Sequence, residues 1–179
     1  MKKELSLTAI AVFAAALTMI GLANDAEAAA YIKFDGVDGE ATDSKHKEWI
    51  DVLSFQQAIT RADSSSSARA RASAVFHDIV ITKELDKSSP KIAEAIAMGM
   101  VYPSVEFEIT DSSRAAYLKY ELKNVMVTSY SISGSANDVP VEEISLNYEE
   151  IKVTYTENDS SGQSKGNVEY SWKVEEGTS

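Results

Sequence analysis

The 179-residue sequence contains no cysteine and only two histidines. Without cysteine the chain can form no disulfide, no thiolate zinc site and no thiol nucleophile. The two histidines, His46 and His77, are distant in the sequence and lack the HExxH spacing of a zinc-binding helix. We therefore expect both to be hydrogen-bonded structural residues rather than metal ligands or catalytic bases.

The common sequence signatures of enzymes are missing as well. Serine is abundant, but no GxSxG motif occurs, and the glycines form neither GxGxxG nor a P-loop. Four acidic residues gather beside a glycine turn (Asp35, Asp38, Glu40 and Asp43), yet their spacing does not match a calcium-binding EF-hand loop. We predict a protein that is not an enzyme and that uses no metal and no cofactor.

The sequence contains two glutamate doublets, Glu142-Glu143 and Glu149-Glu150. Paired carboxylates can act as an acid and a base, so each doublet is a candidate catalytic pair. Adjacent residues of a β-strand point to opposite faces, so neither doublet is a ready-made catalytic pair. We interpret the glutamates as outward-facing, and we predict a β-bulge at Glu149-Glu150, where the apolar alternation changes from even to odd positions.

Positive charge is scarce: 17 lysines and arginines face 28 acidic residues, giving a net charge of −11 at pH 7. An acidic surface repels nucleic acid and anionic lipid, so neither is an expected partner. Arg61, Arg69 and Arg71 stand together in the low-complexity segment RADSSSSARARAS, which also contains Ser64. Such a polar segment cannot form a core and is typical of a solvated or binding loop.

The first 28 residues have the layout of a secretory signal peptide. Lys2 and Lys3 precede an uncharged, mostly apolar run over residues 5–22, and the AxA sequence ending at Ala28 offers a cleavage site before Ala29. A second site lies at the next alanines, and an uncleaved membrane anchor is the alternative because the run approaches the length of a span. We favour cleavage, which predicts a secreted or periplasmic protein with no stable membrane insertion.

Removal of residues 1–28 leaves a single domain, residues 29–179. The leader holds two of the basic and three of the acidic residues, so 15 basic and 25 acidic residues remain, with a net charge of −10. A chain of this length buries roughly 70% of the surface that it exposes when unfolded. It can therefore build a core without disulfides.

The mature chain reads as a β protein with one helix. Apolar residues alternate over most of its length, in the segments 31–35, 49–59, 78–82, 105–109, 117–132, 144–155 and 168–174. Helical spacing occurs once, at about residues 90–98, after Ser89 as N-cap and Pro90 at the first position, and it ends at Gly99. This pattern predicts an antiparallel β-barrel or sandwich with one flanking helix.

The longest predicted strand, residues 117–132, changes character along its length. Its first half is charged on one face, whereas Val125 and Val127 make the second half apolar on both faces. We predict that these two valines pack against something beyond their own sheet. The helix, a second sheet and another subunit are the alternatives, which makes the pair a candidate packing or subunit interface.

Four stretches, in order, carry motifs that go beyond strand alternation. Residues 31–55 (YIKFDGVDGEATDSKHKEWIDVLSF) contain an opening strand, an Asp-Gly turn and a His-x-x-Trp-Ile segment. Residues 78–92 (DIVITKELDKSSPKI) contain the helix start Leu-Asp-Lys-x-Ser-Pro. Two later strands lie in residues 116–135 (AYLKYELKNVMVTSYSISGS) and 141–156 (VEEISLNYEEIKVTYT). Together these stretches span nearly all of the mature chain, and they resemble the haemolysin-coregulated protein family, the tube protein of the type VI secretion system.

The resemblance implies a β-barrel with one flanking helix, hexameric rings that stack into a hollow tube, and no catalysis. It implies that the chain's main partner is itself, with spike, sheath and effector proteins as further partners. It also implies that the segment with Arg61, Ser64, Arg69 and Arg71 is an extended loop that reaches a neighbouring ring. Alternation of arginine with alanine and serine would suit contact with an acidic neighbour.

The predicted leader departs from this family, whose tube protein assembles in the cytoplasm and needs no leader of its own. Either the chain serves a periplasmic or surface assembly, or the leader is not processed. An alternative function of another class is an exported binding module or adhesin that acts as a monomer or a single ring. Assembly into rings or tubes would distinguish the first function from the second.

Overall fold

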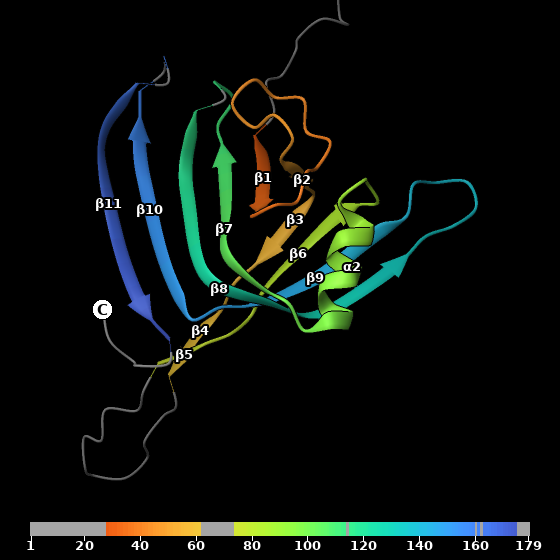
Figure 1. Cartoon of the computed structure of the whole chain (residues 1–179). Helices are drawn as coiled ribbons and strands as arrows, with labels where there is room; N and C mark the ends of the chain where they lie inside the picture. Colours follow the sequence, from red (N-terminus) through yellow and green to blue (C-terminus); the bar gives the residue numbers. More distant parts are fainter. Residues whose placement is uncertain (1–27, 62–73, 114, 160, 162, 175–179) are drawn as a thin grey trace, which may run out of the picture.

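The computed structural model describes residues 28–61, 74–113, 115–159, 161 and 163–174. Within these ranges the chain forms a mainly β structure with one helix (Figure 1). The elements are β1 (Ala29–Phe34), β2 (Ile50–Val52), β3 (Ser54–Gln56), β4 (Ile59–Arg61), β5 (Ala74–Phe76), β6 (Ile79–Glu84), α2 (Ser89–Met98), β7 (Val101–Thr110), β8 (Ala116–Ser133), β9 (Val141–Asn147), β10 (Glu150–Asn158) and β11 (Ser164–Lys173).

The main sheet closes on itself. Its strands follow the order β2-β1-β7-β8-β9-β6-β3, with antiparallel pairing throughout. The first and last strands of this order, β2 and β3, are joined by the single residue Leu53, whose N–H donates to the carbonyl of Thr82 at 2.8 Å. The predicted fold class, an antiparallel β-barrel with one flanking helix, is therefore confirmed.

The segment predicted as one strand over residues 49–59 is divided in the structure. The chain bends at Leu53 and again at Gln57 and Ala58, giving three short strands in place of one. Strand β2 pairs with β1, β3 pairs with β6, and β4 leaves the barrel to pair with β5. The mixture of apolar residues at even and odd positions reflects these bends.

Strand β8 changes the face that it turns to the core. Tyr120 and Leu122 are buried before Asn124, and Val125 and Val127 are buried after it. Asn124 has a φ of 50°, a left-handed conformation. Lys123 and Asn124 are successive residues that are both exposed, so the alternation of buried and exposed side chains is interrupted there. Val125 and Val127 lie in the core of the chain itself, in the same buried cluster as Ile92 and Ala95 of α2, and the Met126 side chain between them is exposed. Packing with the helix is one of the three alternatives that the sequence left open.

The partner of β8 bends at the same level. Strands β9 and β10 pair with β8 in nearly one continuous register, interrupted at Tyr148 and Glu149. The N–H of Glu149 donates to the carbonyl of Lys123 at 3.1 Å, which ties the two bends together. The predicted change of alternation is present, but the chain forms a corner between β9 and β10 there in place of a β-bulge within one strand. Beyond this corner β9 pairs with β6, whereas β10 pairs with β11 (Figure 1).

Helix α2 covers one flank of the barrel with Ile92 and Ala95, whose side chains are fully buried. Its C-terminal cap is the predicted one, since Gly99 has a φ of 63° and its N–H donates to the carbonyl of Ile96. Its start differs from the prediction: Ser88 occupies the cap position without a side-chain cap, and the Ser89 hydroxyl turns into the protein. No helix among the described residues is long and apolar enough to cross a membrane.

Candidate assembly surfaces

A small hairpin formed by β4 and β5 stands apart from the barrel (Figure 1). Phe76 anchors it, because its ring stacks on Trp172 of β11 with ring centres 5.8 Å apart. Ile59 and Val75 are exposed on the hairpin, although apolar side chains usually avoid water. Ile59 is paired with Phe76 and shares the attached face, whereas Val75 lies on the other face, so the hairpin offers an exposed apolar side chain on each face.

The predicted stacking residues belong to the connection between these two strands. Arg61 is exposed at the end of β4, opposite Ala74 of β5. Ser64, Arg69 and Arg71 lie outside the described residues. The chain therefore attaches the arginine-rich segment to the free end of the β4–β5 hairpin.

The polar face of the sheet formed by β7, β8, β10 and β11 carries lysines and glutamates in alternation. Lys119 of β8 binds Glu106 of β7 at 2.6 Å, and Lys152 of β10 binds Glu169 of β11 at 3.0 Å. A shallow cavity of about 390 Å³ on these strands is lined by Glu121, Lys123, Glu150, Ile151, Lys152, Ser171, Trp172 and Lys173. Opposite charges compensate one another here, which suits contact with water or with polar chains more than with an apolar partner.

A second hollow, of about 300 Å³, lies where β6 ends and the chain approaches α2. It is lined by Glu40, Asp51, Leu53, Glu84, Leu85 and Asp86, and we call this set of residues the acidic notch. The notch combines carboxylates with two exposed leucines. Charge in the notch is thus of one sign, in contrast to the mixed charges on β7, β8, β10 and β11.

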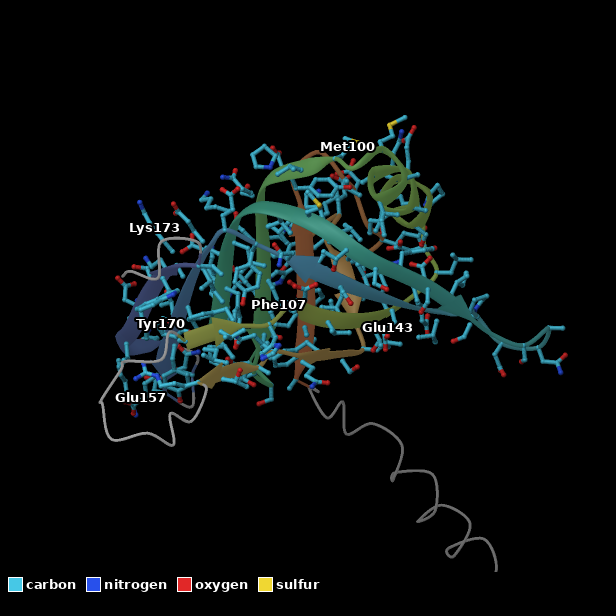
Figure 2. The ribbon with its side chains drawn as sticks, turned by 90° about the horizontal axis from the view of Figure 1, so that it is seen from below. Met100, Phe107, Glu143, Glu157, Tyr170 and Lys173 are labelled. Carbon is cyan, nitrogen blue, oxygen red and sulfur yellow. The ribbon has the colours of Figure 1, made fainter. Side chains whose placement is uncertain are left out.

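Exposed methionines form an apolar patch near the end of α2. Val101 of β7 is paired with Met126 of β8, and both are exposed; Met98 and Met100, at the end of the helix, are exposed as well. Figure 2 shows Met100 beside the helix, far from the β11 residues Tyr170 and Lys173. Methionine side chains are flexible and adapt to a partner's shape. The sequence interpretation chose Val125 and Val127, but Met126 is the exposed residue of that stretch.

A buried polar network joins α2 to the barrel. The Lys83 ammonium contacts Glu142 at 2.7 Å and Asp86 at 2.8 Å, and the Ser89 hydroxyl donates to Glu142 at 2.8 Å. The Tyr130 hydroxyl donates to the other Glu142 oxygen. Burial, this hydrogen bond and the negative charge of Glu142 raise the pKa of Tyr130 to about 12. The side chains of Lys83 and Glu142 are both 0% exposed, so this central ion pair has a structural role and no contact with solvent, whereas Asp86 at the edge of the network is 11% exposed.

Sequence reasoning missed this network, although a signal was present. Lys83 continues the alternation of the buried residues Ile79 and Ile81, and Glu142 occupies the core side of β9 two residues before Ile144. Glu142 was interpreted as outward-facing and Lys83 was not singled out, because lysine and glutamate are rarely buried without a partner. The prediction that the Glu142-Glu143 doublet faces outward is wrong for Glu142 and holds for Glu143, which is exposed.

His46 is buried in a network of its own. Its Nδ1 lies 2.9 Å from Asp43 and its Nε2 lies 2.9 Å from Glu108, while its ring stacks on Tyr31 at a centre distance of 4.2 Å. This arrangement ties the connection between β1 and β2 to the side of the barrel. His77 begins the connection to β6, and its Nε2 lies 2.9 Å from the Thr60 hydroxyl.

The acidic residues near the glycine turn are used in other ways. Asp38 pairs with Lys33 at 2.8 Å, and a hydrogen bond and the charge of that lysine lower the pKa of Asp38. Asp43 accepts hydrogen bonds from the backbone N–H groups of Lys45 and His46. Within the part of the chain that the structure describes, no group of three or more histidine, aspartate or glutamate residues is arranged to hold a metal ion.

Comparison with known proteins gives consistent matches over most of the chain. Residues 31–155 match a family described as "Type VI secretion system effector, Hcp". The chain is 30% identical over 151 residues to protein hcp1 of Pseudomonas aeruginosa, and the match covers 80% of this chain and 93% of that protein.

Solved structures with the same fold extend the comparison. A structure described as a type six secretion system protein superposes with a TM-score of 0.78 at 32% identity, covering 84% of this chain and 98% of the other. Hcp1 from Salmonella typhimurium superposes with a TM-score of 0.71 at 25% identity, covering 85% and 98%. Both matches span nearly the whole length of those proteins.

Proposed function

Because the chain belongs to the Hcp family of type VI secretion systems, we propose that it is a non-enzymatic structural protein that assembles into homo-oligomeric, hexameric rings. The observation that carries this proposal is the agreement over residues 31–155 in sequence, together with the superposition of the whole barrel. The alternative of a solitary exported binding module is not favoured, since these comparisons lead to one family of secretion proteins.

We propose further that the rings stack into a tube through the segment between β4 and β5. The hairpin supports this role because Phe76 fixes its base on Trp172 while Ile59 and Val75 remain exposed for contact. Arg61, Ser64, Arg69 and Arg71 are the residues we assign to the contact with the next ring. Spike, sheath and effector proteins are the further partners that a secreted tube would need.

Deletion of residues 64–71 tests the stacking role. We expect the deleted protein to form single rings and no tubes, because the barrel keeps its core while the contact between rings is lost. Negative-stain images and native mass spectrometry would measure both states, with the unmodified chain as reference. A matched control replaces the same eight residues by a glycine-serine segment of equal length, which should also stay unstacked.

Either of two results would contradict these assignments. Tubes that form as readily after the deletion would remove this segment from the stacking contact. An unmodified chain that remains monomeric at the concentrations where single rings are expected would remove the assembly proposal itself. The second result would instead favour the exported binding module.

The leader is a separate proposal. We propose cleavage between Ala28 and Ala29 and a location outside the cytoplasm; residues 1–27 lie outside the described residues. Ala29 is the first residue of β1, and its carbonyl accepts a hydrogen bond from the Thr110 hydroxyl at 3.3 Å. Cleavage there would leave β1 complete, whereas cleavage after Ala30 would remove its first two residues. N-terminal sequencing of the exported protein should give a start at Ala29; a start at Met1 would overturn the proposal.

A further inference from the structure

The acidic notch is built to attract a partner that is both basic and partly apolar. Its lining includes Leu53 and Leu85, which are 57% and 42% exposed. Glu40, Asp51 and Glu84 belong to the same lining and are also exposed. Apolar side chains in the lining favour the removal of water on binding, and the carboxylates favour a cationic partner.

The negative charge of the notch is only partly compensated inside the chain. Asp86 is paired with Lys83, but among the described residues no lysine or arginine side chain forms an ion pair with Glu40, Asp51 or Glu84. Burial and the nearby charges of Asp86, Asp43 and Glu84 raise the pKa of Asp51. The carboxylates thus repel one another, and a bound cationic group would relieve that repulsion.

The β4–β5 hairpin, which carries the arginine-rich segment, and the notch lie near opposite ends of β6. Strand β6 begins at Ile79, three residues after β5 ends, and finishes at Glu84 in the notch (Figure 1). Its six residues span about 17 Å. Two copies placed head to tail would therefore bring the hairpin end of one barrel to the acidic notch of the other.

We propose that the acidic notch of one copy receives the arginine-rich segment, residues 61–73, of a second copy in the next ring. This inference rests on the proposed stacking of rings and names the surface that accepts the segment. Two different surfaces of the same chain then meet at each contact. A heterologous contact of this kind does not close upon itself, so each ring leaves one set of notches free for the next, and the stack can grow.

Reciprocal charge reversal tests the pairing. We expect Arg69→Glu with Arg71→Glu to abolish stacking, and Asp51→Lys with Glu84→Lys to abolish it separately. The Asp51 and Glu84 carboxylates are chosen because Glu40 accepts the Lys87 N–H at 3.0 Å and should be kept. All four substitutions together restore the original net charge and reverse the contact, so stacking should return. If the fourfold variant formed rings that did not stack, the pairing would be overturned.

The absence of cysteine supplies a second test that does not depend on charge. In the variant Leu53→Cys with Ala70→Cys, each copy carries one cysteine in the notch and one in the segment, so a notch-to-segment disulfide would join each copy to the next. We expect mild oxidation to give a ladder of cross-linked chains from stacked samples and no ladder from single rings. Either single-cysteine variant should give dimers at most. Stacking without cross-linking would refute the notch as acceptor while leaving the proposed function intact; absence of stacking in the unmodified chain would refute both.

Discussion

Replacement of Glu142 by alanine should destabilise the protein by about 3–5 kcal/mol, the typical cost of leaving one partner of a buried ion pair without the other. The Lys83 ammonium would keep Asp86 but would lose its closest carboxylate, at 2.7 Å, with no access to water. The hydroxyls of Ser89 and Tyr130 would lose their acceptor at the same time. Urea unfolding of the variant and the unmodified chain would measure the difference, at one protein concentration because association stabilises the folded state.

The neighbouring residue provides the matched control. Glu143 is exposed on the other face of β9, so Glu143→Ala should change the free energy of unfolding by no more than about 0.5 kcal/mol (Figure 2). The double variant Lys83→Met with Glu142→Met should lose less stability than the two single variants added together, because no buried charge is then left unpaired. Equal losses for Glu142→Ala and Glu143→Ala would show that the network does not hold the helix to the barrel.

Gly39→Ala is the second substitution with a large expected effect, about 3 kcal/mol or more, which is the upper range for overpacking. A Cβ atom at this position would lie 2.3 Å from the carbonyl oxygen of Trp49 and 2.5 Å from Ile50 Cγ1. The backbone here cannot withdraw easily, because the Gly39 N–H donates to the carbonyl of Glu48 at 2.8 Å. Thermal unfolding monitored by circular dichroism would report the loss.

Gly36 is the control for a backbone effect without a collision. It has a φ of 75°, and an added Cβ would meet nothing within 4 Å. Gly36→Ala should therefore cost only the left-handed conformation of a residue with a side chain, about 1–2 kcal/mol. If Gly39→Ala proved milder than Gly36→Ala, the close approach of the β1–β2 connection to Trp49 would not be a determinant of stability.

The sequence predicted the fold class because alternation survives wherever a strand keeps one face toward the core. Strand β7, with Val105, Phe107 and Ile109 buried, is such a case. The interpretation failed where the backbone changes face. Apolar periodicity cannot reveal that Asn124 adopts a positive φ, so the sequence left open whether Val125 and Val127 pack against the helix, a second sheet or another subunit.

The candidate surfaces were only partly predictable. The arginine-rich segment stands out in the sequence by composition alone. The acidic notch does not, because its residues come from the β1–β2 connection, the bend at Leu53 and the end of β6, and only the closed barrel brings them together. Likewise, the pairing of Lys83 with Glu142 joins residues 59 positions apart, which no local pattern can indicate.

The bend at Leu53 has a kinetic consequence. The barrel is closed by β2 and β3, two strands of three residues each, and they are the shortest members of the main sheet. Strand β2 pairs with β1, and β3 pairs with β6. Strand β1 also pairs with β7, which is distant in the sequence. Because β2 and β3 contribute only three residues each, we expect this seam to be the first part of the barrel to open under partial unfolding. The lifetime of the closed barrel would then depend on the few backbone hydrogen bonds on either side of Leu53.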